Sequence, residues 1–447
     1  MAELADLCRA AVEAAEGPEA VEAFAEESRS TTVKARKGEV DGLSFSETRG
    51  VGIRLISGGR LGYSYAADPS PDEVRQAVAR ARENAALGSE DEFNVLPDAV
   101  DAEPLPDLYR ERQASLPTDE KVKLAIGLER VATTTDPRVS KVDEAQVGDA
   151  VSRVAIASTA GVAAEYARTD AWCLAVTLAE QHGETQTGFS YRIGRELGDL
   201  GLEQVAIEAV VRAAQMLGAE KPPTARVPVV LDPFAASDFL GVLAGALSAE
   251  SVLKKRSLFA ELVGQQVGAE AFTLIDDGRF PTGPGAAPFD DEGVPTGRTK
   301  LFSDGVLGGF LHNTYTAARM GGATVSTGNA SRAGYRSTPG VGTTCFYVEP
   351  GERSLEDLLQ HAEDGVLIRE VSGVHSGANP ISGEFSVGAT GLRIREGAAA
   401  EGLREMTIAS TLPEMLKAIT AVGSDLRWFS SVGTPSILIG EMTVAGV

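Results

Sequence analysis

Histidine and cysteine are scarce in this chain, which has four histidines and three cysteines among 447 residues. A zinc site needs three or four His, Cys or carboxylate ligands, and two of them often stand one helical turn apart. The four histidines are far apart in the sequence, and neither an H-E-x-x-H nor an H-E-x-x-x-H motif occurs. The sequence therefore predicts no dedicated zinc site, although ligands distant in the sequence could still assemble one.

Long hydrophobic runs are also missing. No apolar stretch approaches the roughly 20 residues that span a bilayer, and the acidic, amphipathic start resembles neither a signal peptide nor a transit peptide. The three cysteines, Cys8, Cys173 and Cys345, are odd in number and widely separated, which argues against a disulfide framework. We therefore expect a cytoplasmic protein that makes no membrane contact.

Positive charge is in deficit. Lys and Arg number 41 against 64 Asp and Glu, which gives a formal net charge of −23. Such a surface repels phosphate backbones. The one compact basic cluster, Lys254-Lys255-Arg256, ends a predicted helix, where cations commonly interact with the last carbonyl groups. A nucleic-acid partner is therefore not expected.

Signatures of nucleophilic or nucleotide-dependent catalysis are absent as well. The chain has no G-x-S-x-G elbow, no P-loop and no G-x-G-x-x-G fingerprint. Cys345 lies in an alternating strand pattern and is expected to be a buried structural thiol. His375 and Ser376 are adjacent in a glycine-flanked loop, and adjacent residues rarely orient as base and nucleophile. An enzyme that uses Cys345 or His375 without a metal remains an alternative.

The length predicts two domains. Residues 219–226 (AEKPPTAR) have the composition of a linker, so we place the domains at residues 1–218 and 227–447. In the first domain, helical periodicity alternates with strand patterns, and Gly58-Gly59 marks a tight hairpin. Ser70 and Glu73 predict a capping box at the start of a helix. This domain is expected to be α+β, with helices packed on a sheet.

The second domain is expected to be mostly antiparallel β and barrel-like, which makes the whole chain α+β. A buried-strand pattern (VPVVLDP) leads into a helix predicted over residues 234–253, and a last strand is predicted over residues 435–447.

Three consecutive carboxylates precede a glycine in the second domain. Asp290, Asp291 and Glu292 lie between Phe289 and Gly293. This pattern is typical of a solvated turn, but it could also form a loop that orders a dimer or a substrate channel. We therefore take the three carboxylates as candidate interface or chamber residues.

Glycine and polar residues also gather in two later loops. Thr327, Gly328, Asn329 and Arg332 belong to a stretch that reads either as a flexible surface loop or as a site that offers main-chain and amide groups to an extended peptide. Ser376 and Gly377 belong to the other loop. We take these six as candidate substrate-binding residues.

Several short segments together resemble the TldD/PmbA family, whose members are also called modulators of DNA gyrase. They follow the family's order along the chain: Arg49-Gly50-Val51-Gly52-Ile53-Arg54, Ser257-Leu258-Phe259, Val263-Gly264-Gln265-Gln266-Val267, Phe289-Asp290-Asp291-Glu292-Gly293, Gly305-Val306-Leu307-Gly308-Gly309, Thr327-Gly328-Asn329 and Ser431-Val432-Gly433-Thr434-Pro435-Ser436. No single segment is specific, but together they identify the family.

The resemblance implies a fold, a partner and a branch of the family. In the TldD branch, H-E-x-x-x-H on a helix and a later cysteine hold the metal. Here the corresponding residues 241–254 contain no histidine, and residues 423–428 contain no cysteine. The chain therefore resembles the other branch, TldE (PmbA). Glu250 lies on that helix and is expected to be a capping or pairing carboxylate.

The family further implies a heterodimer with a metal-bearing TldD-like paralogue. The paralogue would hold the zinc and cleave extended peptides, while this chain would hold no cofactor and complete the substrate chamber. The acidic charge would favour cationic or neutral peptides. The chain could also form a homodimer when alone. The alternative is a homodimeric binding or scaffold protein without peptidase activity.

Overall fold

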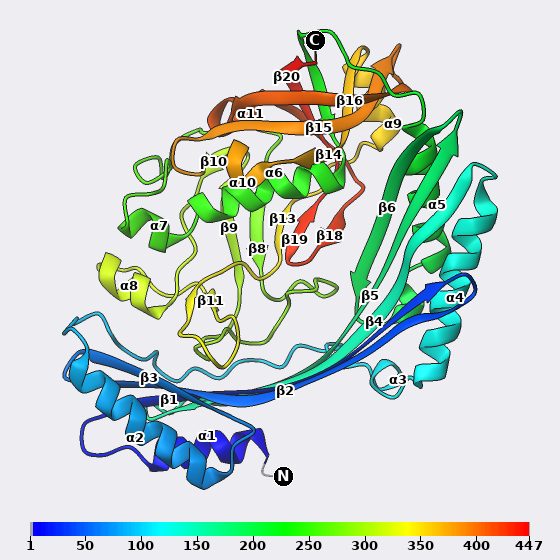
Figure 1. The fold of residues 1–447 in the computed structure, drawn as a ribbon. Helices are drawn as coiled ribbons and strands as arrows, with labels where there is room; N and C mark the ends of the chain where they lie inside the picture. The colour runs from blue at the N-terminus through cyan, green and yellow to red at the C-terminus, as the bar shows by residue number, and fades with distance from the viewer. Residues whose placement is uncertain (1–2, 447) are drawn as a thin grey trace.

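The first part of the chain forms one strongly curved antiparallel sheet. The computed structural model describes residues 3–446. The sheet has six strands in the order β3-β2-β1-β4-β5-β6, and it wraps around the C-terminal half of the molecule (Figure 1). Its strands are β1 (Ala20–Arg36), β2 (Glu39–Ser57), β3 (Arg60–Ala67), β4 (Val139–Ser158), β5 (Ala163–Gln181) and β6 (Glu184–Gly194).

Helices cover the outer face of this sheet at both of its ends (Figure 1). One end carries α1 (Leu4–Glu13) and α2 (Pro71–Leu87), which bury one apolar core against β1 and β2. The other end carries α4 (Thr118–Thr135) and α5 (Leu202–Gln215), which bury a second core. Two short turns, α3 (Glu111–Ala114) and η1 (Leu197–Asp199), lie nearby.

Local sequence signals explain where several of these elements begin and end. Gly58 and Gly59 both have positive φ, as a two-residue hairpin between β2 and β3 requires. The Ser70 hydroxyl accepts a hydrogen bond from the Glu73 amide, and the Glu73 carboxylate accepts one from the Ser70 amide. The predicted capping box is therefore confirmed.

The C-terminal half contains a closed five-stranded barrel. Its strands are β7 (Ala225–Leu231), β14 (Gly365–Ser372), β15 (Glu384–Arg395), β16 (Ala398–Thr411) and β20 (Ile437–Ala445). Pairing of β16 with β20 closes the ring. All neighbours are antiparallel except β7 and β14. The predicted α+β class, with helices on a sheet and a barrel-like second half, is confirmed.

A second six-stranded sheet lies beside the barrel, in the order β10-β9-β8-β13-β19-β18. Its strands are β8 (Leu274–Asp277), β9 (Arg298–Ser303), β10 (Val306–Leu307), β13 (Phe346–Val348), β18 (Arg427–Phe429) and β19 (Val432–Thr434). Short β11 (Ala330–Ser331) and β12 (Gly340–Val341) pair with each other, and β17 (Ile419–Val422) pairs with β20. A large apolar core joins this sheet to the barrel.

The helices of this half are short, and one differs from the prediction. They are α6 (Pro233–Ala246), α7 (Ala249–Leu253), α8 (Thr314–Met320), α9 (Leu355–Ala362), α10 (Val374–Gly377) and α11 (Leu412–Ala418). The single helix predicted over residues 234–253 is wrong, because it is interrupted at Leu247 and Ser248. Ser248 leaves the helix to bridge Leu311, and its hydroxyl caps α7.

The predicted linker adjoins the barrel. Its last residues, Ala225 and Arg226, already belong to β7, and the amide of Glu220 donates to the carbonyl of Gly402. Residues 1, 2 and 447, which fall in the predicted first domain and last strand, lie outside the described residues. Within residues 3–446, no helix is both long and apolar enough to cross a membrane.

Candidate functional site

The three consecutive carboxylates form a turn in which Asp290 and Glu292 are buried and Asp291 is half-buried, rather than a solvated turn. Asp290 is 5% exposed and Glu292 is 1% exposed. Asp290 shapes the turn, since its carboxylate accepts hydrogen bonds from the amides of Glu292, Val294 and Ala330 at 2.9–3.0 Å. Burial and the charge of Glu292 raise the pKa of Asp290 well above its ordinary value.

The tip of this turn presses against the N-terminal sheet. Gly293 has φ +82°, and a Cβ there would come within 2.5 Å of Val162, which leads into β5. Only glycine fits both the backbone conformation and the close approach. The turn is therefore a contact between the two halves of one chain.

Arg54 connects the turn to the sheet. From β2, its guanidinium donates to both oxygens of Glu22 on β1, at 3.1 and 2.5 Å, and to Glu292 at 2.7 Å. The three side chains are no more than 7% exposed. Although burial alone would raise the pKa of Glu292, the charge of Arg54 and a hydrogen bond from the Thr314 amide lower it.

Arg332 completes this cluster. Its guanidinium pairs with Glu22 and lies over the ring of Phe24 on β1. Its amide donates to the Asp291 carboxylate at 2.7 Å. Burial raises the pKa of Asp291 to about 6. We call Glu22, Arg54, Asp291, Glu292 and Arg332 the junction network, because the residues come from both halves of the chain.

The loop of Thr327, Gly328 and Asn329 is also fixed within the chain. The Asn329 amide donates to Asp276 on β8 at 2.7 Å and to the Gly342 carbonyl at 3.0 Å. Thr327 donates to Asn329 at 2.7 Å. Gly328 has φ +72° and contacts Pro295 so closely that a Cβ would collide with its carbonyl. These side chains therefore brace the fold, and Ala330 and Ser331 beyond them pair with β12.

Ser376 and Gly377 lie elsewhere, on α10, which packs against β15. Ser376 is exposed, and its hydroxyl donates to the Gly373 carbonyl at 3.1 Å. The neighbouring His375 lies near Asp238 of α6: burial raises the pKa of Asp238, and His375 acts in the opposite direction. The sequence candidates thus occupy two separate places, the junction network with its bracing loop and the α10 turn.

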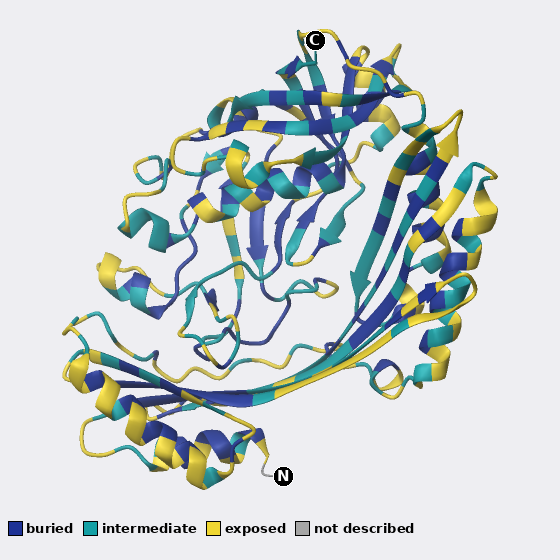
Figure 2. Cartoon of the chain, viewed as in Figure 1, coloured by how far each residue is buried: buried dark blue, intermediate teal, exposed yellow. Residues whose placement is uncertain are grey.

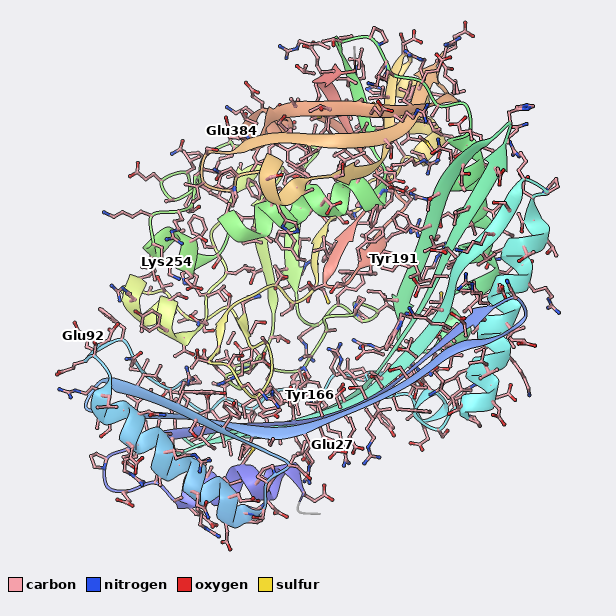
Figure 3. All side chains as sticks on the ribbon, viewed as in Figure 1. Glu27, Glu92, Tyr166, Tyr191, Lys254 and Glu384 are labelled. Atoms are coloured by element: carbon pink, nitrogen blue, oxygen red, sulfur yellow. The ribbon has the colours of Figure 1, made fainter. Side chains whose placement is uncertain are left out.

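Helix α6 lies against β18 and β19, which brings together two regions that are distant in the sequence. An aromatic cluster covers the contact. Phe234 of α6 meets Phe189 and Tyr191 of β6 and Phe429 of β18 at centroid distances of 4.7–6.3 Å. Tyr191 lies between β6 and the C-terminal half (Figure 3). Asp238 of α6 lies near this cluster, since its charge adds to the burial that raises the pKa of Tyr191.

These residues do not form a metal site. The polar side chains of α6 are those of Ser237 and Asp238, and β18 offers no His, Cys or carboxylate. Within residues 3–446, no group of three or more His, Cys, Asp and Glu side chains is placed to hold a metal ion. His312 is buried, and burial lowers its pKa.

The N-terminus of α6 is held by a second set of buried charges. Asp232 caps the helix by accepting from the amides of Phe234 and Ala235, and it pairs with Arg212 of α5 at 2.8 Å. Glu208 of α5 pairs with Arg427 of β18 at 2.6 Å. Both halves of the chain therefore fix the position of α6.

A cavity of about 420 Å³ opens at the other end of α6, beside α7. Arg54 and Asn313 form part of its wall. Glu250 of α7, Lys254 directly after α7 and Arg319 of α8 add charges of both signs. Glu250 pairs with Lys254, as expected for a pairing carboxylate. In Figure 3, Lys254 and Tyr191 lie at opposite ends of the C-terminal half.

Cys345 is fully buried, and burial raises the pKa of its thiol to about 12. A fully buried thiol with a raised pKa fits the structural role expected for Cys345. Sequence reasoning did not place Glu22 or Arg54 in the candidate site, since each lies in an ordinary strand pattern and its partners are distant in the sequence.

Three family models match the chain in succession. They are the PmbA/TldA metallopeptidase domain 1 at residues 21–85, the central domain at residues 111–217 and the C-terminal domain at residues 224–446.

Whole-chain relatives agree with these models. The chain is 28% identical to "Metalloprotease PmbA" of Escherichia coli O157:H7, covering 93% of this chain and 90% of the relative. It is 27% identical to "Metalloprotease TldD homolog" of Haemophilus influenzae, covering 90% and 88%. The crystal structure of TldE from Thermococcus kodakarensis shares the fold, with a TM-score of 0.90, 24% identity and 99% of each chain covered. With the three models spanning both halves of the fold, this chain belongs to the PmbA/TldD metallopeptidase family.

Proposed function

We propose that this chain is the non-catalytic, TldE-type subunit of a heterodimeric metallopeptidase. Its partner is a metal-bearing TldD-like paralogue, and its substrates are unfolded peptides or peptide-like intermediates. One observation carries the proposal. Helix α6 lies against β18 and β19, yet α6 contains no His or Cys, and β18 contains no His, Cys or carboxylate.

The chemistry assigned to the paralogue is attack of a metal-activated water on a peptide carbonyl. This chain would contribute surfaces that bind the peptide, and it would restrict which proteins can enter the chamber. The aromatic cluster and the cavity beside α7 offer apolar surface and charges of both signs to an extended peptide. A closed chamber excludes folded proteins and holds the carbonyl in position.

We place this complex in the cytoplasm. Cys8, Cys173 and Cys345 are free and buried, which is compatible with a reducing compartment. Fractionation of cells that express the tagged chain tests the assignment, and recovery in a secreted or membrane fraction would contradict it.

The decisive experiment measures cleavage of an unstructured peptide by this chain alone and by this chain mixed with an H-E-x-x-x-H-bearing paralogue. Both samples are assayed with and without a zinc chelator. We expect cleavage only in the mixture and its loss with chelator. A mixture containing the paralogue with both histidines replaced by alanine is the control and should be inactive.

Two results would overturn the proposal. Chelator-insensitive cleavage by this chain alone would point to a metal-free site, and His375→Ala would then be the first variant to test. A lack of cleavage in every mixture, with the chain dimeric by itself, would favour the homodimeric binding or scaffold protein.

A further inference from the structure

The cavity of about 420 Å³ beside α7 lies between the two halves of the chain. Strands β2 and β3 and the loop after α2 line it on one side, and α7, α8 and the segment that leads into β12 line it on the other. This volume is in the lower part of the range for small-ligand sites. Part of the wall is apolar and is formed by Ile56, Leu61, Val95 and Leu253. The cavity therefore has room for a small molecule or the end of a peptide, but not for a folded protein.

One buried donor in this wall lacks an acceptor. Asn313 directly precedes α8, is 4% exposed and lines the cavity. Its side-chain oxygen accepts hydrogen bonds from the amide and the hydroxyl of Thr316, both at 2.9 Å, so its side-chain nitrogen points the other way. Among residues 3–446, this nitrogen has no hydrogen-bond partner. Buried amide groups are normally hydrogen-bonded, so the nitrogen indicates a ligand that offers an acceptor.

Arg319 adds a cation that is already held in place. Helix α8 passes from buried residues at its start to exposed residues at its end, where Arg319 lies (Figure 2). The Nη1 atom donates to Asp91 at 3.2 Å and to the Tyr315 hydroxyl at 2.5 Å, and the guanidinium lies 5.7 Å from the centre of the Phe93 ring. Within the described residues, Nε and Nη2 have no hydrogen-bond partner. This free edge of the guanidinium matches the two oxygens of a carboxylate.

The charges around the cavity favour a ligand with a single negative charge. Arg54 is committed to the junction network, and Lys254 pairs with Glu250. Glu250 is the one carboxylate among the lining residues that the structure describes, and it would repel a second negative charge on a ligand. A carboxylate attached to an apolar group therefore fits the cavity better than a doubly charged phosphate does.

We propose that this cavity binds the C-terminal carboxylate of a peptide whose last residue is apolar. The free edge of Arg319 pairs with the carboxylate, the last side chain contacts the apolar wall, and Asn313 donates to a main-chain carbonyl of the peptide. This assignment rests on the proposed function, which brings peptides to this chain. It adds that the chain holds a peptide by its end, so peptides with a free C-terminus are preferred to internal segments of a protein.

The test measures binding of a short, neutral, fluorescein-labelled peptide that ends in leucine, by fluorescence anisotropy. The peptide is used as the free acid and as the C-terminal amide. The full chain is assayed alone and mixed with a paralogue whose two motif histidines are replaced by alanine, so that the peptide stays intact. We expect the acid to bind about tenfold more tightly than the amide, because a hydrogen bond to a charged group has about this effect.

Three variants of charged residues assign the effect to the cavity. Arg319→Gln should weaken binding of the acid to that of the amide and leave the amide unchanged. Arg298→Gln is the matched control and should bind as the wild type does, because Arg298 is equally exposed (47% against 46%) and pairs with Glu349 at 3.0 Å but does not line the cavity. Glu250→Gln should strengthen binding of the acid severalfold, a gain that a damaged fold cannot produce.

Asn313→Asp tests the buried donor. The variant keeps the side-chain oxygen that accepts from Thr316 but loses the nitrogen, so it should weaken binding of the acid and of the amide while the melting temperature stays close to that of the wild type. Unchanged binding of both peptides by this variant would contradict the role of Asn313.

Three results would overturn the proposal. They are equal binding of the acid and the amide by the wild-type chain, alone and in the mixture; wild-type binding by both Arg319→Gln and Glu250→Gln; and binding of N-acetylleucine without binding of the peptide, which would assign the cavity to small free carboxylates. None of these readouts depends on cleavage. The proposed function can therefore fail while the acid is still preferred, and the mixture can cleave peptides while that preference is absent.

Discussion

Arg54 of β2 and Glu292 of the C-terminal half form a buried ion pair at 2.7 Å, although 238 residues separate them in the chain. Because Glu22 of β1 accepts from the same guanidinium, one arginine pairs with a carboxylate from each half. Arg54 is therefore one of the buried cations, together with Arg332, that join the sheet to the C-terminal half.

Replacing Arg54 by methionine should strongly destabilise the chain. It leaves Glu292 buried without its arginine and Glu22 with Arg332 alone, and an unpaired buried charge typically costs about 3–5 kcal/mol. Urea unfolding measures the change. Arg75→Met is the control, since Arg75 is half exposed and pairs with Asp72 within one helix turn, and its loss should cost less than about 1 kcal/mol. Equal effects of the two variants would contradict the role given to Arg54.

The pair of Glu208 and Arg427 predicts a loss of stability in acid. Burial alone would raise the pKa of Glu208, but the charges of Arg427 and Arg212 outweigh it and lower the pKa from 4.5 to about 2. The stabilisation is complete above pH 4.5 and is lost as the pH falls towards 2. We expect Glu208→Gln to remove roughly 3 kcal/mol at neutral pH. Its unfolding free energy should vary less than that of the wild type between pH 5 and 3.

Asp291 predicts the opposite dependence. Because burial raises its pKa from 3.8 to about 6, the folded chain binds a proton more tightly than the unfolded chain does. Stability should therefore decrease as the pH rises from about 4 to about 6. Asp291→Asn should flatten the profile of melting temperature against pH in that window. An unchanged slope in the variant would show that Asp291 does not titrate there.

Gly62 and Gly127 should respond oppositely to alanine. A Cβ on Gly62 of β3 would come within 1.9 Å of the Ala81 carbonyl on α2, so Gly62→Ala must push the helix off the sheet and destabilise the chain by a few kcal/mol. Gly127 lies inside α4 with nothing within 4 Å of such a Cβ. Gly127→Ala should stabilise the chain by up to about 1 kcal/mol. Thermal unfolding of the two variants measures both changes, and the melting temperature should fall for Gly62→Ala and rise for Gly127→Ala.

The sequence predicted features that depend on neighbouring residues. The capping box of Ser70 and Glu73 and the Gly58-Gly59 hairpin are local patterns, and both are present. The break at Ser248 was not predictable, because its cause is pairing with Leu311, 63 residues further along the chain. Local periodicity carries no information about such a partner.

In the candidate site, too, the sequence predicted local geometry but not contacts with distant residues. The pattern around Asp290 and Glu292 correctly indicated a turn, since Gly293 has positive φ. It gave no sign that the turn is buried, because burial depends on Arg54 and Glu22 from the opposite end of the chain. The six candidate substrate-binding residues remain untested as peptide contacts. The hydrogen bonds of Asn329 and the ion pair of Arg332 assign those two side chains a bracing role.

The closed barrel also constrains the order in which the chain can fold during synthesis. The N-terminal sheet uses residues 20–194 alone, so it can form while the rest of the chain is still being made. The barrel cannot close at that stage, because β7 must wait for β20, which begins about two hundred residues later. Until then, one edge of β7 and the apolar interior of the barrel are uncovered. The nine-residue strand β20 therefore closes the barrel only after residues 437–445 have been made.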